Sequence, residues 1–248
     1  MWLNGVVRII YFSPHLDDAV LSAGGLIRRQ VDEGAEVEIW TFMAGVPDVA
    51  ELSDFAREMH GIWGFESAEQ TVNARRAEDA RAASVVGAKA VHYEFLDCLY
   101  RRGRNGQILY SDVFVPIHAE DADLAAQIAQ AMIAWLRPDD QVVCQLSIGA
   151  HVDHVIVRKA AELLRRPLTY DADMPYLLNH PDELKPNVTG MQESLQPVSE
   201  AGLECWIAGI ECYASQIEAV FGSHAAMQKE MRDYWKAQRG VRYWTRAE

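Results

Sequence analysis

The sequence contains little cysteine. Its four cysteines, Cys98, Cys144, Cys205 and Cys212, include no CxxC pair. This spacing does not suit a cysteine-ligated zinc site or a redox dithiol. Cys144 lies in an apolar run and is typical of a buried thiol. We therefore expect four reduced cysteines in a cytoplasmic protein, and a metal site built from other residue types.

Long apolar stretches and an excess of positive charge are also missing. The longest apolar runs, such as residues 6–12, are far shorter than the roughly 20 residues of a membrane-spanning helix. Residues 1–10 lack the features of a secretory signal. The net charge is −13 and the sequence pI is about 5.0. Because such a surface repels phosphate backbones and anionic lipid heads, we expect neither nucleic acid nor a membrane as a partner.

What is present is an ordinary globular composition. Half of the 248 residues are hydrophobic, 24% are charged and 9% are aromatic. No repeat, low-complexity tract or linker interrupts the chain. We therefore predict a single domain over residues 1–248.

The pattern of apolar residues alternates between strand and helix. Short β-branched and aromatic runs are typical of buried strands, and segments with apolar residues at helical spacing separate them. The alternation predicts an α/β fold, a three-layer, Rossmann-like and mostly parallel sheet with helices on both faces. We expect strands over 6–12, 37–43, 90–95 and 141–146, helices over 19–31, 74–86, 121–136, 152–165, 206–221 and 225–238, and substrate-selecting loops over 46–72, 98–116 and 174–200.

The segment Ser13-Pro14-His15-Leu16-Asp17-Asp18 falls where the first strand ends and the first helix begins. Ligand sites of open parallel sheets lie at such strand ends, and ionisable groups buried there must be paired or bound. Helix capping would explain one carboxylate only. A divalent ion explains all three groups, with His15 and Asp18 as ligands and Asp17 beside them. Nitrogen and oxygen ligands suit zinc first, with iron, cobalt or manganese as alternatives.

A second polar segment, residues 149–154, follows the fourth strand. His154 can complete a His, Asp, His ligand set that leaves positions open for water and substrate, as catalytic zinc sites do. His151 would face the same cavity as a donor to a developing oxyanion. Asp153 would orient one of the histidines from behind. The two segments together predict a metal-dependent hydrolase.

The sequences SPHLDD (13–18) and HVDH (151–154) resemble the signature of the PIG-L/LmbE family of zinc-dependent deacetylases, whose usual forms read PHPDD and HPDH. The resemblance implies a de-N-acetylase that acts on a small N-acetylglucosamine-type glycoconjugate. It also implies three metal ligands, a general base and an oxyanion-stabilising histidine, which fall on His15, Asp18 and His154, on Asp17, and on His151.

The likeness extends between and beyond these motifs. Arg75-Arg76-Ala77-Glu78 is similar to the family's Arg-x-x-Glu helix and implies a substrate contact for Arg75. A salt-bridged helix surface is the alternative for Arg75 and the preferred interpretation of Arg76. Segments around Tyr170 to Tyr176 and around Tyr213 to Phe221 resemble those of one bacterial branch.

Two departures from the family pattern are visible. Leu16 replaces a common proline, which affects loop rigidity rather than chemistry. Gly149 stands where some members carry a tyrosine that helps to stabilise the tetrahedral intermediate. Another residue must fill that role here, or catalysis is weaker.

The residue types suggest a mechanism. The ion would activate a water, Asp17 would take its proton, and the ion with a protonated His151 would stabilise the oxyanion. Asp97 and Arg101 follow the third strand and either reach a sugar hydroxyl or belong to a polar loop. Trp40, Trp63 and Trp135 either line a sugar platform or, more often for tryptophan, pack in the core.

Other functions remain open at this stage. The same site would serve an amidase on a non-sugar amide, a deacylase of an antibiotic, or an inactive homologue that binds metal or sugar. A symmetric homo-oligomer is also possible, as several relatives of the family form one.

Overall fold

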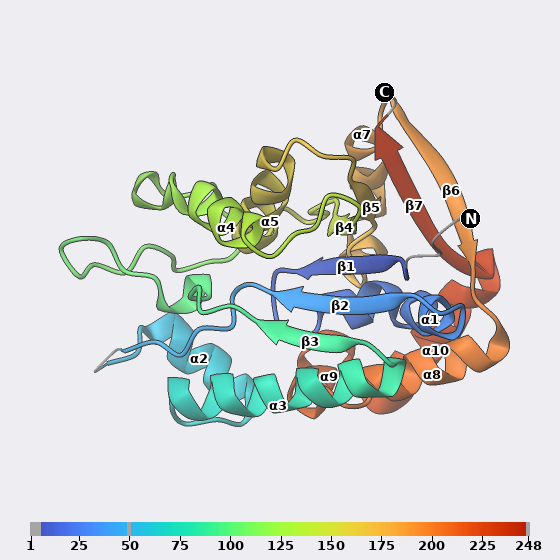
Figure 1. Cartoon of the computed structure of the whole chain (residues 1–248). Helices are drawn as coiled ribbons and strands as arrows, with labels where there is room; N and C mark the ends of the chain where they lie inside the picture. Colours follow the sequence, from blue (N-terminus) through green and yellow to red (C-terminus); the bar gives the residue numbers. More distant parts are fainter. Residues whose placement is uncertain (1–5, 49–50, 247–248) are drawn as a thin grey trace.

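The computed structural model describes residues 6–48 and 51–246, and in this part of the chain seven strands form one sheet (Figure 1). The strands are β1 (Arg8–Ser13), β2 (Glu36–Thr41), β3 (Lys89–His92), β4 (Gln141–Gln145), β5 (Thr169–Asp171), β6 (Met191–Pro197) and β7 (Gly240–Arg246). They lie in the order β3-β2-β1-β4-β5-β7-β6. The strands from β3 to β5 run parallel, whereas β7 and β6 add an antiparallel pair at one edge.

Strand β1 lies near the centre of the sheet, and each of its residues is buried. Ile9 pairs with Val37 of β2 on one side and with Gln141 of β4 on the other. A parallel strand covered on both faces is apolar almost throughout, which explains the run Ile9 to Phe12. Because β2 and β3 continue on one side and β4 and β5 on the other, the order of the chain reverses between β1 and β4. Ligand sites of such sheets lie at this reversal.

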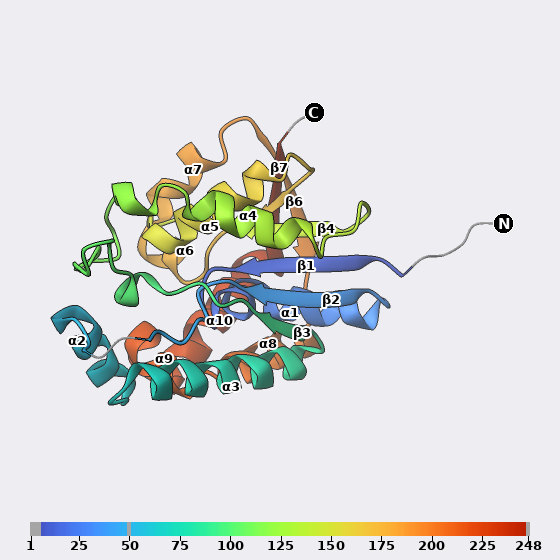
Figure 2. The same ribbon diagram turned by 60° about the vertical axis from the view of Figure 1, so that its left-hand side comes forward.

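Helices cover both faces of the sheet (Figure 1, Figure 2). The α-helices are α1 (Asp18–Asp32), α2 (Asp54–Trp63), α3 (Ala68–Val86), α4 (Leu124–Ile133), α5 (Val152–Leu163), α6 (Tyr176–Asn179), α7 (Leu184–Asn187), α8 (Glu200–Ile210), α9 (Ala214–Phe221) and α10 (His224–Gln238), and the 3-10 helices are η1 (Cys98–Tyr100), η2 (Ala119–Asp121) and η3 (Pro181–Glu183). Helices α4 and α5 pack on one face, and α1, α3 and α8 form the layer on the other. None of the helices in the described ranges is long and apolar enough to cross a membrane.

Close packing fixes α1, the helix that begins at the first polar motif. A Cβ at Gly24 would lie 2.7 Å from Cδ1 of Trp206 on α8, so only glycine allows this approach. The Trp206 indole also donates a 2.7 Å hydrogen bond to the carbonyl of Val20. Both contacts join α1 to α8, and they hold the N-terminus of α1 in place beside β1.

The expected architecture is confirmed, since the sheet is mostly parallel and helices cover both faces. The four expected strands and most of the expected helices are present, with ends shifted by a few residues. Trp40 is buried in the core, whereas Trp135 is 70% exposed.

Several expected segments are wrong in detail. The helix expected over 206–221 is two helices, because the chain breaks at Tyr213, whose hydroxyl donates to Asp79 of α3 at 2.8 Å. The loop expected over 46–72 contains α2, which Ser53 caps by accepting from the Ala56 N–H. Strands β5, β6 and β7 were not expected, and β6 lies within the stretch taken as a loop.

Candidate active site

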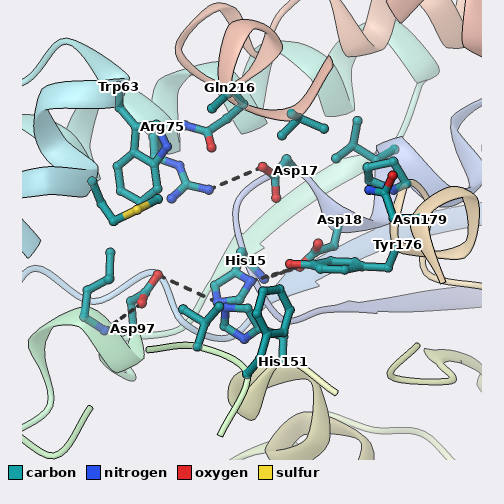
Figure 3. A pocket seen from close by; sticks show the side chains of 18 of the residues that line it. His15, Asp17, Asp18, Trp63, Arg75, Asp97, His151, Tyr176, Asn179 and Gln216 are labelled. Carbon is teal, nitrogen blue, oxygen red and sulfur yellow. Dashed lines mark hydrogen bonds and ion pairs between the residues drawn. The ribbon is translucent and has the colours of Figure 1, made fainter. Parts of the chain in front are cut away.

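The two polar motifs meet at the carboxyl ends of β1 and β4, where the order of the chain reverses. A pocket of about 490 Å³ opens at this point (Figure 3). His15, Asp17, Asp18 and His151 line it, and His154 lies directly behind, fully buried. Residues separated by more than a hundred positions in the sequence therefore form one site.

The turn from β1 into α1 is fixed by its own hydrogen bonds. The Ser13 hydroxyl donates to the carbonyl of His15 at 2.7 Å and accepts from the Ala19 N–H at 3.1 Å. Asp17 occupies the N-cap position, but its side chain makes no capping hydrogen bond to the described backbone. Asp18 accepts a 2.7 Å hydrogen bond from the His15 N–H. Helix capping therefore does not account for Asp17, and its carboxylate faces the pocket.

The Asp18 carboxylate lies between two histidine nitrogens at the base of the pocket. Asp18 Oδ2 lies 3.3 Å from His15 Nδ1 and 3.4 Å from His154 Nε2. Nitrogen and oxygen ligands about 2 Å from a tetrahedral ion lie about 3.3 Å from one another. The spacing on either side of Asp18 is thus that of neighbouring ligands around one ion.

Carboxylates hold the far nitrogen of each candidate histidine ligand. His15 Nε2 lies 3.1 Å from Asp153 Oδ2, and His154 Nδ1 lies 3.2 Å from Asp173 Oδ1. Such outer partners orient a ligating histidine and increase its basicity. Asp153 occupies the position expected from the sequence. Asp173 was not foreseen, although it follows β5, another strand that ends at this edge of the sheet.

The donor set fits a metal ion of the zinc type. His154 Nε2 is buried and lacks a hydrogen-bond partner within the described residues, although it points toward Asp18. A buried ring nitrogen left in this state is costly unless something binds it. His15, His151 and His154 also offer nitrogens within 4.8 Å of one another. Two imidazoles and one carboxylate are a normal ligand set for catalytic zinc.

The two neighbouring aspartates have opposite electrostatic settings. Burial raises the pKa of Asp17, and the adjacent Asp18 carboxylate raises it further, against the opposing charge of Arg75. Burial also acts to raise the pKa of Asp18, but His154 and His15 outweigh it and hold that pKa well below the usual range. One carboxylate is therefore a stable anion suited to an ion, and the other binds a proton more readily.

The pKa of His15 is also shifted. Burial alone would lower it, but hydrogen bonds to Asp153 and Asp18 raise it well above the usual range. In a site with this excess of negative charge, a cation is favoured beside His15.

His151 presents a proton donor to the same pocket. Its Nδ1 accepts a 3.2 Å hydrogen bond from the Asp153 N–H, so the hydrogen of a neutral imidazole lies on Nε2. Burial lowers the pKa of His151 well below the usual range, and the nearby His15 and His154 lower it further. The protonated His151 expected from the sequence stays a prediction.

The residues expected to touch substrate divide into two groups. Arg75 and Asp97 both line the pocket. A guanidinium nitrogen of Arg75 lies 3.4 Å from Asp17 Oδ2, and Asp97 Oδ2 lies 3.7 Å from His15 Nε2.

Arg101 does not line the pocket, because its guanidinium is paired with Asp153 and with Asp121 behind the site. Arg101 thus supports Asp153, which in turn holds His15.

The space in front of Gly149 is filled by an aromatic ring. Gly149 has φ of +81°, and a Cβ there would lie 2.9 Å from Cδ1 of Tyr176. The ring centroid of Tyr176 lies 5.1 Å from that of His154, edge to face. Figure 3 shows the tyrosine reaching from α6 into the pocket, with its hydroxyl end beside Asp18. A larger residue at position 149 would displace this ring.

The sequence analysis did not assign several residues of the pocket. The missed ones come mainly from α2, α6 and α9 and from the loop before η2. Trp63 lines the pocket and also packs against a small core cluster. Among the missed residues are Phe55, Met59, Phe114, Tyr176, Asn179 and Gln216.

Comparison with known proteins gives one family and several relatives. The family model described as PIG-L, GlcNAc-PI de-N-acetylase, matches residues 10–164. The 2'-N-acetylparomamine deacetylase of Niallia circulans is 23% identical over 249 residues, which cover 87% of this chain and 83% of that protein.

Two solved structures are similar over almost the whole chain. The zinc-inhibited form of a teicoplanin deacetylase has a TM-score of 0.82 and 27% identity, and the match covers 96% of this chain and 97% of that one. An A40926 pseudoaglycone deacetylase has a TM-score of 0.77 and 27% identity, with 98% and 97% covered. Both share the fold of this chain from β1 to β7.

Proposed function

Because the chain belongs to the PIG-L family of GlcNAc-PI de-N-acetylases, we propose that it hydrolyses the N-acetyl amide of a small N-acetylglucosamine-type glycoconjugate to a free amine and acetate. It is a zinc-dependent amide hydrolase. The observation that carries this proposal is the buried His154 Nε2, which has no hydrogen-bond partner among residues 6–48 and 51–246. It faces Asp18 Oδ2 beside a pocket that contains a separate carboxylate, Asp17. The deacetylases similar to it, which act on a paromamine derivative and on glycopeptide antibiotics, support the substrate class.

We assign the ion to His15 Nδ1, Asp18 Oδ2 and His154 Nε2. A bound zinc ion supplies Lewis-acid chemistry, which makes a water more acidic and an amide carbonyl more electrophilic. Iron, cobalt or manganese would suit the same donors. Asp153 and Asp173 keep the two imidazoles in the orientation and tautomer that ligation needs.

Asp17 acts as the general base. It accepts a proton from the water whose oxygen attacks the amide carbon, and it later returns that proton to the departing amine as the C–N bond breaks. Its burial and the adjacent Asp18 raise its pKa, which makes it a stronger base toward the water than an ordinary carboxylate. Arg75, 3.4 Å away, keeps the carboxylate oriented between these two steps.

Two side chains stabilise the negative oxygen of the tetrahedral intermediate. His151 donates from Nε2, since its Nδ1 is held by the Asp153 N–H. The Tyr176 hydroxyl is the second donor and fills the role that Gly149 cannot. Burial raises the pKa of Tyr176 well above the usual range, and Asp18 and Asp17 raise it further, so the phenol keeps its proton.

We further propose that residues 1–248 form one catalytic domain that works in the bacterial cytoplasm. Assembly into a symmetric homo-oligomer stays a prediction, and light scattering on the purified protein tests it. The acidic composition supports small molecules, rather than nucleic acid or membranes, as partners.

The proposal is tested by metal analysis of the purified protein together with a free-amine assay on N-acetylglucosamine conjugates, with and without chelator. We expect about one ion per chain and amine release that chelator abolishes. An acetylated amine without a sugar serves as the comparison substrate. Release from that compound alone would identify an amidase, and metal without any turnover would identify an inactive homologue.

A further inference from the structure

The pocket extends well beyond the proposed zinc ligands. Its volume of about 490 Å³ lies within the range for ligands larger than one sugar ring. Asp17, Asp18 and Asp97 lie around the candidate metal site, and residues 112–114 and α6 form another part of the lining. Helices α2 and α9 supply a further part of the wall, which has a different chemical character.

Helix α2 turns one apolar face toward the pocket. Phe55, Met59 and Trp63 follow one another at intervals of four residues, which places them on one side of the helix. All three are half-buried, and each keeps surface open to the pocket. We call these three residues the α2 wall.

The wall across from α2 adds no charge. Helix α9 contributes Ala219, Val220 and the amide of Gln216 to the pocket lining. Arg75 lies between the two helices, but its guanidinium sits 4.7 Å from the ring centroid of Trp63 and also faces Asp17. The cation therefore covers part of Trp63 and leaves Phe55 and Met59 as the open apolar surface.

The α2 wall is rigidly supported. Buried Ala56 and His60 lie on the adjoining side of α2, and His60 Nε2 lies 2.7 Å from the Tyr100 hydroxyl. Ser53 caps the first turn, and Gly64 ends the helix with φ of +78°. An apolar surface held open in this way is prepared for a ligand and does not collapse when it is empty.

We infer that the α2 wall is a subsite for an apolar aglycone, an aromatic or alkyl group attached to the N-acetylglucosamine ring. The inference rests on the proposed function, which places the acetamide at the metal site and so directs the rest of the conjugate along this wall. A hydroxylated or charged aglycone against the α2 wall would lose water, and Phe55 and Met59 offer it no hydrogen bond in return. An apolar aglycone gives up no hydrogen bonds to water, and it covers the apolar surface of Phe55 and Met59.

The test compares kcat/KM for three conjugates, the phenyl, methyl and inositol N-acetylglucosaminides. We expect the phenyl conjugate to exceed the other two by about 10- to 100-fold, the gain from burying one apolar group. Met59→Gln and Phe55→Gln should each raise KM for the phenyl conjugate by about tenfold, and change kcat far less.

Ile62→Gln is the matched control. It makes the same kind of change on the same helix, at a residue that is 53% exposed and does not line the pocket. Its kinetics should equal those of the unmodified protein, and zinc content and thermal unfolding show whether each variant is folded.

The outcomes separate this inference from the proposed function. Equal kcat/KM for the three conjugates, a preference for the inositol conjugate, or equal effects of Met59→Gln and Ile62→Gln would overturn the subsite while deacetylation stands. If no conjugate, the methyl one included, releases an amine from zinc-loaded protein, the proposed function fails and the subsite with it.

Discussion

The two ends of β1 both bury charge, but they do so differently. At the amino end, Arg8 donates to Asp140 at 2.8 Å and 2.6 Å and lies 3.6 Å from Glu38. At the carboxyl end, His154 Nε2 has no hydrogen-bond partner within the described residues, and Asp17 has a single ion pair at 3.4 Å. Buried charged groups that are paired with one another stabilise the fold. Buried polar groups without a full set of partners can instead bind a ligand, and that binding supplies the missing interactions. Five predictions test this contrast.

The largest effect should follow from His154→Ala. Removal of a ligand should leave the protein without zinc and reduce amine release to the uncatalysed background. Metal analysis and the amine assay check both. Asp173→Asn is the graded comparison, because loss of an outer partner should weaken metal affinity by about 10- to 100-fold. A His154→Ala protein that retains one zinc per chain would contradict the ligand assignment.

Asp17→Asn should separate chemistry from metal binding at the same end. The amide keeps the shape of the side chain but cannot take a proton from water. We expect kcat to fall by about 10²- to 10⁴-fold while zinc content stays the same. If kcat were unchanged, the base would have to be another group.

At the amino end of β1, Arg8→Met should lower the stability of the protein and leave kcat unchanged. The change leaves Asp140 and Glu38 buried without their partner, so we expect the free energy of unfolding to fall by about 3 kcal/mol. Because Arg8 is far from the pocket, kcat at a temperature where the variant is folded should not change. Urea unfolding measures the first quantity and the amine assay the second.

Arg242→Met is the control for Arg8→Met. Its 3.7 Å ion pair with Glu193 is half-exposed, and such pairs contribute less than about 1 kcal/mol. Equal destabilisation by the two changes would mean that burial of the Arg8 pair has no special importance.

Tyr176→Phe should give a smaller change in activity. It removes one donor to the oxyanion but keeps the ring that packs on Gly149 and His154. We expect kcat to fall about tenfold, with KM and the unfolding curve little changed. Tyr93→Phe, at a tyrosine that does not line the pocket, is the control. Equal kcat in the two variants would remove Tyr176 from the mechanism.

The smallest expected effect is the pH dependence of the destabilisation caused by Arg8→Met. Burial alone would raise the pKa of Asp140, but the hydrogen bonds from Arg8 and from the Arg137 N–H hold it below the usual range. A lowered pKa stabilises the folded state above the unfolded value, about 3.9, and this contribution disappears as the pH falls through the folded pKa. The destabilisation caused by Arg8→Met should therefore shrink below about pH 4 in urea unfolding series. A constant difference at all pH values would contradict the pairing.

The parallel core could be predicted from the sequence because its strands are buried on both faces. Apolar runs such as Ile9 to Phe12 have no other common explanation, and polar motifs directly after two of them indicated the site. Strands β5 and β6 gave no such signal. β5 has only three residues, and β6 is almost entirely exposed, so neither shows an apolar run or a clear alternation.

The rest of the site could not be predicted for a similar reason. Asp173 reaches His154, and Tyr176 reaches the pocket, only because β5 pairs with β4, a contact that local patterns do not encode. Arg101 had the right residue type and position for a substrate contact, but Asp121 and Asp153 bind it from behind. A signal for α2 did exist, since Ser53 and Gly64 bracket an amphipathic segment, yet the loop-like residues before it obscured the pattern.

The strand order that joins β1 to β4 also sets when this protein can acquire its metal. Asp18 leaves the ribosome long before His154, and the segment between them includes β2, β3 and α4. A nascent chain that ends before residue 154 holds two of the three proposed donors and lacks the sheet that would bring in the third. We expect such a chain to compete poorly for zinc in the cell. Capture of the ion would then follow the synthesis of β4 and the start of α5, and a shorter chain would draw little from the cellular zinc pool.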